Sequence, residues 1–308
     1  MPFVKEKFTV PRKMPAFAFI MQLFNMSQGQ AQRVISKGRL LIDDTSFYHS
    51  GKHIEGDVEV VYFKPSSKGN KPLFHTKDFM VFEKHSGILV HPKTMATPYS
   101  LLDEIRAVAG DDANAVHRID METSGLLLAS KHKSSESYLK SSFESRSIQK
   151  SYLAWVDGKI TEPFSSTERI KINDDYSQTK HKVFISDEGK NSHTDFTPLE
   201  YNEKLDATLL ACYPHTGRTH QIRVHLFHVK HPILGDPIYG TSFKAANAYL
   251  EDELSPKERL EETGATRLML HAQSLSFKMG PLFHIESKSD FSKMKDLICA
   301  KDERVFNH

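Results

Sequence analysis

The stretch HRIDMETSGLLLAS occupies residues 117–130, and its second half, SGLLLAS, is an apolar run typical of a buried strand. Downstream, several segments alternate apolar and polar residues as strands of an antiparallel sheet do. They are KSYLAWVDG (150–158), HKVFISD (181–187), TDFTPLEY (194–201) and ATLLACYP (207–214). Few helical segments separate these strands, and no regular βαβ alternation occurs. The sequence therefore predicts an α+β domain.

Two helices and a small hairpin are expected ahead of this domain. Apolar residues recur at helical spacing over 14–38, and Ser27 is placed to cap the second helix. RLLID (39–43) and VEVVYF (58–63) are predicted to be the strands of the hairpin. The Pro/Ser/Gly-rich PSSKGNKP (65–72) has the composition of a linker. We therefore expect an extension over 1–13, a small αα-β-hairpin domain over 14–65, a linker over 66–72 and a large domain over 73–308.

Composition narrows the class of protein only coarsely. The 308 residues carry a formal net charge of +2, so any attraction to an anionic partner must be local rather than global. The two cysteines, Cys212 and Cys299, form no CxxC motif, which favours a reducing, cytoplasmic location. The run AFAFIM (16–21) is too short for a membrane span and is expected to lie in an amphipathic helix.

The acids of the opening stretch allow two interpretations. In a strand, Asp120 and Glu122 would point the same way and resemble the paired acids of glycoside hydrolysis. METSG is also typical of a turn, in which one or both acids would be exposed. For Glu122 we expect a surface position.

A histidine-rich block, HTGRTHQIRVHLFHVKHPILGD (215–236), is the second candidate site. Its histidines are His215, His220, His225, His228 and His231. In a helix, positions 220 and 225 point well apart, and no cysteine lies nearby, so we expect no metal site. A basic, polar helix face that contacts phosphates is the preferred interpretation.

Taken together, these segments resemble the RluA-type pseudouridine synthases. HRIDMETSGLLLAS is similar to the family motif H-R-L-D-x-x-T-S-G-L-L-L, and KSYLAWVDG to K-x-Y-x-A-x-x-x-G. TGRTHQIRVHLFHVKHPILGDPIYG and RLMLHAQSLSF are similar to its two remaining blocks, so the match covers roughly residues 80–277. The N-terminal unit resembles the small RNA-binding domain that often precedes these enzymes, by a shorter and less specific match.

The resemblance implies a fold and an activity. The fold is a catalytic domain with a mixed, mainly antiparallel sheet, preceded by the RNA-binding domain. The activity is isomerisation of uridine in RNA to pseudouridine, without cofactor or metal. Ribosomal RNA is the expected partner, with transfer RNA second and no obligate protein partner. Alternatives are a non-catalytic RNA-binding or ribosome-assembly protein on this fold, and a metal-dependent hydrolase that uses the histidine block.

Family position also assigns residue roles. Asp120 is the catalytic residue, Arg218 is the partner that keeps it charged, and Tyr152 stacks on the uracil, although a lone tyrosine in a strand is usually a core residue. Arg118 fills the gap left by the extracted base. The expected RNA contacts are His117, Arg118, Thr123, Lys150, His220 and Arg223, with Lys131, Lys133, Lys140 and Arg146 as further phosphate ligands.

The chain departs from the family pattern at four places. His85 stands where proline is usual, and Lys230 where glycine is common. Ser192 and His193 lie near a position often occupied by alanine, and SFKMGP lacks the usual His-Pro. None of these positions coincides with an expected catalytic residue.

Overall fold

The computed structural model describes residues 2–175 and 180–304. The chain divides into two compact units. The first contains the residues up to Asn70 together with His91–Ala107, and the second contains Lys71–Val90 and the chain from Val108 onward. Among the described residues, no helix is both long and apolar enough to cross a membrane.

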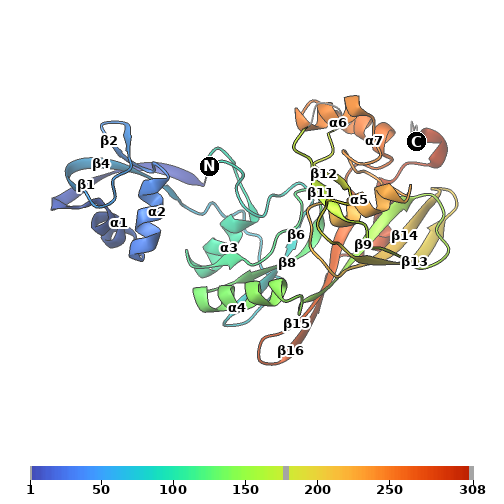
Figure 1. Ribbon diagram of the computed structural model, residues 1–308, viewed down its shortest axis with the longest axis horizontal. Coiled ribbons are helices and arrows are strands. Elements are labelled where there is room, and N and C mark those ends of the chain that lie inside the picture. The colour runs from blue at the N-terminus through green and yellow to red at the C-terminus, as the bar shows by residue number, and fades with distance from the viewer. Residues whose placement is uncertain (1, 176–179, 305–308) are drawn as a thin grey trace. The chain divides into compact units, whose positions relative to one another are not determined.

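The first unit contains a four-stranded antiparallel sheet with two short helices (Figure 1), together with most of α3 (Leu101–Ala109). The strand order is β1-β4-β2-β3. The strands are β1 (Phe3–Pro15), β2 (Leu40–Ile42), β3 (Thr45–Phe47) and β4 (His53–Phe63), and the helices are α1 (Ala16–Phe24) and α2 (Gln28–Ser36). Ile20 of α1 and Ile35 of α2 are fully buried in one cluster with Val60 of β4, so both helices cover this sheet.

The N-terminal extension expected over residues 1–13 is wrong. Most of this segment belongs to β1, which pairs with β4 in a register that runs from Phe3 opposite Phe63 to Pro15 opposite His53. The two strands expected in the hairpin do pair antiparallel, as β2 with β4. The connection differs from the expected one, because β3 lies between them in the chain, the tight turn joins β2 to β3, and β4 begins within the predicted turn. Only Val10 and Met14 of β1 are buried, so the strand has a weak apolar pattern and depends on a partner about fifty residues away.

The expected linker over 66–72 is largely held within the first unit. Ser66 N–H donates to Asp103 Oδ1 (2.9 Å) and Lys68 N–H to Glu104 Oε1 (2.6 Å), both on α3 (Leu101–Ala109). Asp103 and Glu104 are buried, and these backbone donors satisfy their charges. Composition predicted flexibility, but two buried carboxylates fix this segment.

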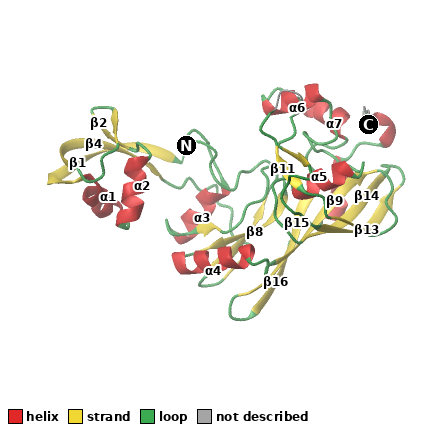
Figure 2. Ribbon diagram, viewed as in Figure 1, coloured by secondary structure: helices red, strands yellow, loops and turns green. Residues whose placement is uncertain are grey.

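The second unit confirms the expected α+β class and the mixed, mainly antiparallel sheet. Its ten-stranded sheet has the order β10-β13-β14-β9-β15-β8-β6-β5, with β16 paired to β15 and β7 to β8 (Figure 2). Only the β15–β8 pair is parallel among the described ladders of this sheet. The strands are β5 (Phe74–His75), β6 (Phe79–Lys84), β7 (Asn114–Ala115), β8 (Ser124–Ser130), β9 (Gln149–Asp157), β10 (Phe164–Ser166), β13 (Thr194–Asn202), β14 (Ala207–Pro214), β15 (Leu270–Lys278) and β16 (Leu282–Glu286).

Helices and a small ribbon complete the second unit. The helices are α4 (Lys133–Glu144), α5 (Gln221–His228), α6 (Phe243–Leu250) and α7 (Pro256–Thr263), with 3₁₀ turns at Phe291–Leu297 and Lys301–Glu303. The ribbon pairs β11 (Ile170–Ile172) with β12 (Val183–Ile185).

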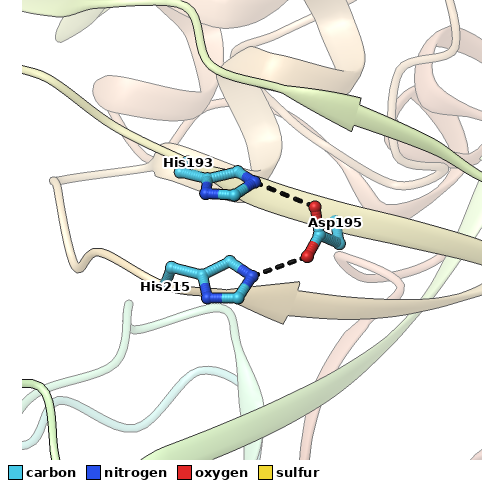
Figure 3. A group of neighbouring side chains, drawn as sticks. All are labelled: His193, Asp195 and His215. Atoms are coloured by element: carbon cyan, nitrogen blue, oxygen red, sulfur yellow. Dashed lines mark hydrogen bonds and ion pairs between the residues drawn. The ribbon is translucent and has the colours of Figure 1, made fainter.

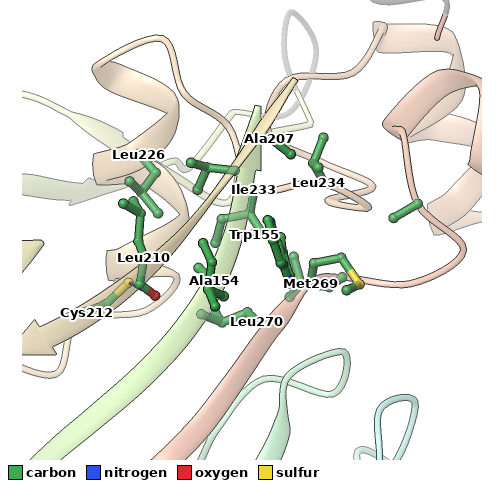
Figure 4. Close-up of a cluster of buried hydrophobic side chains, with 14 of the residues drawn as sticks. Ala154, Trp155, Ala207, Leu210, Cys212, Leu226, Ile233, Leu234, Met269 and Leu270 are labelled. Carbon is green, nitrogen blue, oxygen red and sulfur yellow. Dashed lines mark hydrogen bonds between the residues drawn. The ribbon is translucent and has the colours of Figure 1, made fainter. Parts of the chain in front are cut away.

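The largest core of this unit anchors α5 to the sheet. Trp155 of β9 is fully buried among side chains of β14, β15 and α5 (Figure 4). Ile222 and Leu226, four residues apart on α5, are part of this cluster. Their burial fixes the rotation of α5 and therefore the direction of Arg223 between them.

Gly125 allows the closest approach of two strands. It lies opposite Ala272 where β8 and β15 run parallel, with φ of +102°. A Cβ at this position would lie 2.3 Å from the Ala272 carbonyl oxygen. Only glycine fits, and this contact places the loop before β8 beside the centre of the sheet.

Candidate active site

A cavity of about 590 Å³ lies in the second unit. Its lining comes from the loop before β8 (residues 116–120 and 123), the end of α4 and the turn after it (143–148), and the β9 residues Lys150 and Tyr152. Residues 214–223, from the end of β14 into α5, and Leu270 of β15 complete it. Asp120, Tyr152 and Arg223 all face this one space, although they are far apart in the sequence.

The loop that carries Asp120 is fixed by a buried lysine. Lys84 Nζ donates to the carbonyl oxygens of Met121 (2.8 Å), Ile88 (2.8 Å) and His85 (3.0 Å). Burial lowers the pKa of Lys84 to about 7, although Asp120 and Glu122 act in the opposite direction. The lysine thus holds the backbone next to Asp120, a role that no sequence pattern indicated.

Asp120 forms an ion pair with Arg223. Arg223 Nη1 donates to Asp120 Oδ2 (3.1 Å), while Nε and Nη2 donate to the two oxygens of Asp236 (2.7 and 2.8 Å). The arginine is 4% exposed and Asp120 30% exposed, so the pair is open only on the aspartate side, at the cavity. Asp236 Oδ1 also accepts hydrogen bonds from the backbone N–H groups of Ile238 and Tyr239. These bonds fix Asp236, which in turn holds the guanidinium of Arg223 against Asp120.

This environment keeps Asp120 ionised. Burial alone raises the pKa of this carboxyl, but the neighbouring charges of His220, Arg223 and Arg118 and the hydrogen bond from Arg223 together lower it below the ordinary value. His220 can contribute only when protonated, and burial lowers its own pKa to about 4. At neutral pH, Arg223 is therefore the main source of the shift.

His220 supports the site as a neutral ring. Its Nδ1 lies 3.0 Å from the Tyr239 hydroxyl, and its Nε2 lies 3.8 Å from Asp120 Oδ2. Arg223 lies over the Tyr239 ring, 5.1 Å from its centroid. Tyr239 is 1% exposed, so it contacts His220 and Arg223, the two neighbours of Asp120, from within the core. No sequence pattern singled out this tyrosine.

The structure corrects the two arginine assignments. Arg218, expected as the partner of Asp120, donates from Nε to the Asn191 carbonyl oxygen (3.0 Å) and only lines the cavity. Arg223, expected at phosphates, is the partner and is too deeply buried to reach them. Both arginines belong to one motif block, but Arg218 lies in the turn before α5, whereas Arg223 lies on the helix and faces Asp120.

Tyr152 lies in the cavity wall, half-buried, on β9. Burial and then the charge of Asp120 raise the pKa of its hydroxyl, so the phenol stays protonated at neutral pH. A flat ring with a protonated hydroxyl beside an ionised carboxylate suits contact with a planar base.

The expected RNA contacts divide into exposed and structural residues. Arg118, Arg146 and Lys150 line the cavity; the two arginines are exposed and the lysine is half-buried. His117 accepts the Leu128 N–H at Nε2 (3.0 Å), stacks on Phe143 and has a pKa lowered by burial to about 3. Thr123 is 2% exposed. Both therefore stabilise the loop rather than offer a charged surface.

The remaining lysines of this region have protein partners. Lys133 and Lys140 form ion pairs with Glu136, and Lys131 donates to the Thr76 carbonyl oxygen. These contacts weaken the expectation that they bind phosphates.

Glu122 is buried, contrary to the expected surface position. Arg259 Nη2 donates to Glu122 Oε2 (2.8 Å) and the Tyr249 hydroxyl to Oε1 (3.0 Å). Arg259 lies on α7 and Tyr249 on α6, so this carboxylate attaches both helices to the loop of Asp120. No sequence signal links position 122 to these residues.

The five histidines of the 215–236 block scatter rather than converge. His225 is fully buried against Ser192 and Thr194, and His231 Nδ1 lies 2.7 Å from the Asp157 carbonyl oxygen. His220 faces the cavity, and His215 lies at its edge beside Asp195. The block is therefore not one metal cluster.

Comparison with known proteins identifies the family. Residues 78–228 match the family model described as RNA pseudouridylate synthase. An RNA pseudouridine synthase of Helicobacter pylori (strain ATCC 700392 / 26695) is 39% identical over 93% of this chain and 94% of its own. The ribosomal large subunit pseudouridine synthase C of Pasteurella multocida is 32% identical over 79% of this chain and 72% of its own.

A solved structure shows the same fold. The human RNA pseudouridylate synthase domain containing 1 superposes with a TM-score of 0.60 at 24% identity, over 77% of this chain and 91% of its own. The long match to the Helicobacter relative and the family model together carry the assignment. The chain therefore belongs to the RNA pseudouridine synthases, as an RluA-type enzyme that isomerises uridine in RNA.

Proposed function

We propose that this enzyme acts on ribosomal RNA, with Asp120 as its catalytic residue. The observation that carries the proposal is an ionised carboxylate in a cavity wall, backed by a buried arginine and adjacent to a protonated tyrosine. Ribosomal RNA is favoured because the Pasteurella relative is named for the large ribosomal subunit.

The reaction breaks the bond between uracil N1 and the sugar, turns the base and joins its C5 to the same sugar carbon. The proton on C5 is lost and a proton is gained at N1, so no redox partner or activated water is required. One carboxylate suffices, which agrees with the use of Glu122 in an internal ion pair. An ionised Asp120 is suited to attack on the base, attack on the sugar or removal of a sugar proton.

Tyr152 is proposed to stack on the uracil and Arg223 to keep Asp120 charged while the base covers it. Covering the carboxylate removes water and raises its pKa, which a fixed guanidinium opposes. Asp236 prevents the arginine from moving towards the substrate, because it binds two of the guanidinium nitrogens.

The target nucleotide has to leave its stack, at a cost of a few kcal/mol. We place Arg118 in the vacated position, and Lys150 and Arg146 at phosphates near the cavity. The four-stranded N-terminal unit is proposed to bind RNA as well. We further propose that the enzyme works in the cytoplasm without cofactor or obligate protein partner; both cysteines are free and buried.

Tritium release from RNA labelled at uridine C5 tests the role of Asp120. Ribosomal RNA and transfer RNA substrates are assayed separately with wild type, Asp120→Asn and the control Asp290→Asn, which changes an exposed surface carboxylate. Wild type and control should release tritium from ribosomal RNA, whereas Asp120→Asn should lose activity at least about 1,000-fold, because amide nitrogen cannot replace a carboxylate base or nucleophile.

Equal activity of Asp120→Asn and wild type would refute the assignment of Asp120. Release from transfer RNA alone would refute the assignment of the substrate.

A further inference from the structure

Three side chains outside the described chemistry converge at the edge of the cavity. His193 Nε2 lies 2.9 Å from Asp195 Oδ1, and His215 Nε2 lies 2.6 Å from Asp195 Oδ2 (Figure 3). The two imidazole rings are stacked, with centroids 4.3 Å apart. Within residues 2–175 and 180–304, this is the one group of at least three histidine, cysteine or acidic side chains whose ligand atoms all lie within 4.8 Å.

The β-sheet produces this convergence. His193 immediately precedes β13 and Asp195 is the second residue of that strand, so the two are at the two-residue spacing that places side chains on one face. The register of β13 and β14 pairs Thr194 with Pro214, and the His215 N–H donates to the His193 carbonyl oxygen (3.0 Å). His215, directly after β14, is therefore the cross-strand neighbour of His193. Paired backbone at the ends of the two strands brings all three side chains together.

We propose that His193, Asp195 and His215 bind one divalent transition-metal ion of the zinc class. Two imidazole nitrogens and one carboxylate oxygen form a set that such ions prefer, whereas Mg²⁺ and Ca²⁺ prefer oxygen ligands alone. Ligands about 2.0–2.1 Å from a tetrahedral ion lie about 3.3 Å apart. Here one ligand atom from each of the three side chains lies within 4.8 Å of the other two, so the group is compact enough to close around one ion after side-chain rotation.

The surroundings suit an ion with one open position. Ser165 Oγ donates to Asp195 Oδ1 (2.5 Å) and so orients the carboxylate from outside, as partners of metal ligands do. The three side chains are between 40% and 51% exposed, so a water molecule can complete the coordination. Of the three side chains, only His215 lines the cavity, which places the ion at the cavity edge.

The isomerisation proposed above routes no step through this ion, so the metal site goes beyond that function. Without metal, each ring donates its Nε2–H to Asp195. Binding requires each ring to move that proton to Nδ1, so the two hydrogen bonds are exchanged for two metal bonds. Because all three side chains are proposed to bind the ion, removing any one of these ligands should weaken metal binding.

Isothermal titration calorimetry of the chelator-treated full-length protein with Zn²⁺, without RNA, tests the site. The variants are His193→Ala, His215→Ala and Asp195→Asn. The control is His284→Ala, which removes an exposed histidine paired with Glu286 but with no third ligand. Thermal unfolding of each metal-free variant verifies that it folds, and His215→Gln replaces His215→Ala if that variant does not.

Wild type and His284→Ala should bind one equivalent of Zn²⁺, and Mg²⁺ should neither bind nor compete. His193→Ala and His215→Ala should weaken binding at least about 100-fold, and Asp195→Asn at least about tenfold. Absence of binding to wild type, or equal affinity in the three site variants, overturns the proposal. Because no RNA is present, neither result depends on the isomerase activity.

Discussion

Arg223 joins two carboxylates that lie 116 positions apart in the sequence: Nη1 donates to Asp120 (3.1 Å), and Nε and Nη2 donate to Asp236. The arginine is buried, and each of its guanidinium nitrogens donates to one of these two carboxylates. The charge state of Asp120 therefore depends on the position of a helix and not only on the loop that carries it.

We expect Arg223→Lys to lower kcat at least about 100-fold. A lysine keeps the positive charge but cannot contact both acids at once, so Asp120 loses its fixed partner. The pH at which activity falls should also rise, because burial raises the pKa of Asp120 and the lost hydrogen bond from Arg223 no longer offsets that effect. The matched variant Arg218→Lys should retain the wild-type pH profile. Tritium release measured from pH 4 to 8 distinguishes them, and an unchanged profile in Arg223→Lys would contradict the ion pair.

We expect Arg146 to contribute to the salt dependence of RNA binding, because it is exposed at the cavity and is proposed to contact a phosphate. Each phosphate contact releases counterions, so the affinity falls as salt rises. Arg146→Ala should reduce the slope of log affinity against log salt by roughly one contact, about 0.7–0.9. Lys140→Ala should leave the slope unchanged, because Glu136 already neutralises this lysine. Filter binding at several salt concentrations measures both, and equal slopes would remove Arg146 from the interface.

Buried histidines should make the fold sensitive to mild acid. Burial lowers the pKa of His225 to about 4 and that of His271 to about 4, whereas both are ordinary in the unfolded chain. Between about pH 6.5 and 4 the unfolded state therefore binds more protons, and the free energy of unfolding falls as pH falls. Each histidine adds a slope of up to about 1.4 kcal/mol per pH unit.

Urea unfolding at pH 7, 6 and 5 measures this loss. His225→Gln should reduce the slope, since the amide can still hydrogen-bond Ser192 without titrating. His284→Gln, at an exposed histidine, should retain the wild-type slope. An unchanged slope in His225→Gln would show that its titration does not destabilise the fold.

Gly125→Ala should prevent assembly of the site. Its Cβ would lie 2.3 Å from the Ala272 carbonyl oxygen, and no flexible side chain can move aside. Gly280→Ala is the matched control, because Gly280 also has a positive φ (+76°) but open space around it. The control should cost about 1–2 kcal/mol in thermal unfolding, whereas Gly125→Ala should be largely unfolded. Equal stability of the two variants would contradict the close approach of β8 and β15.

The sequence alone determined the family. The ordered motif blocks predicted Asp120 and Tyr152 as site residues, and the structure has both in the lining of one cavity. Strand alternation predicted the α+β class, because local patterns record which faces are buried. It predicted the N-terminal unit less well: β1 exposes most of its side chains, and its pairing with β4 is a long-range contact that leaves little apolar periodicity.

Only the tertiary structure decided which groups meet Asp120. Arg218 and Arg223 belong to the same motif, and the burial of Ile222 and Leu226 turns Arg223 towards the aspartate. Glu122 joined Arg259, and His193 and Asp195 joined His215, through packing and strand register between segments distant in sequence. Such partnerships depend on geometry in three dimensions, whereas local sequence patterns describe one element at a time.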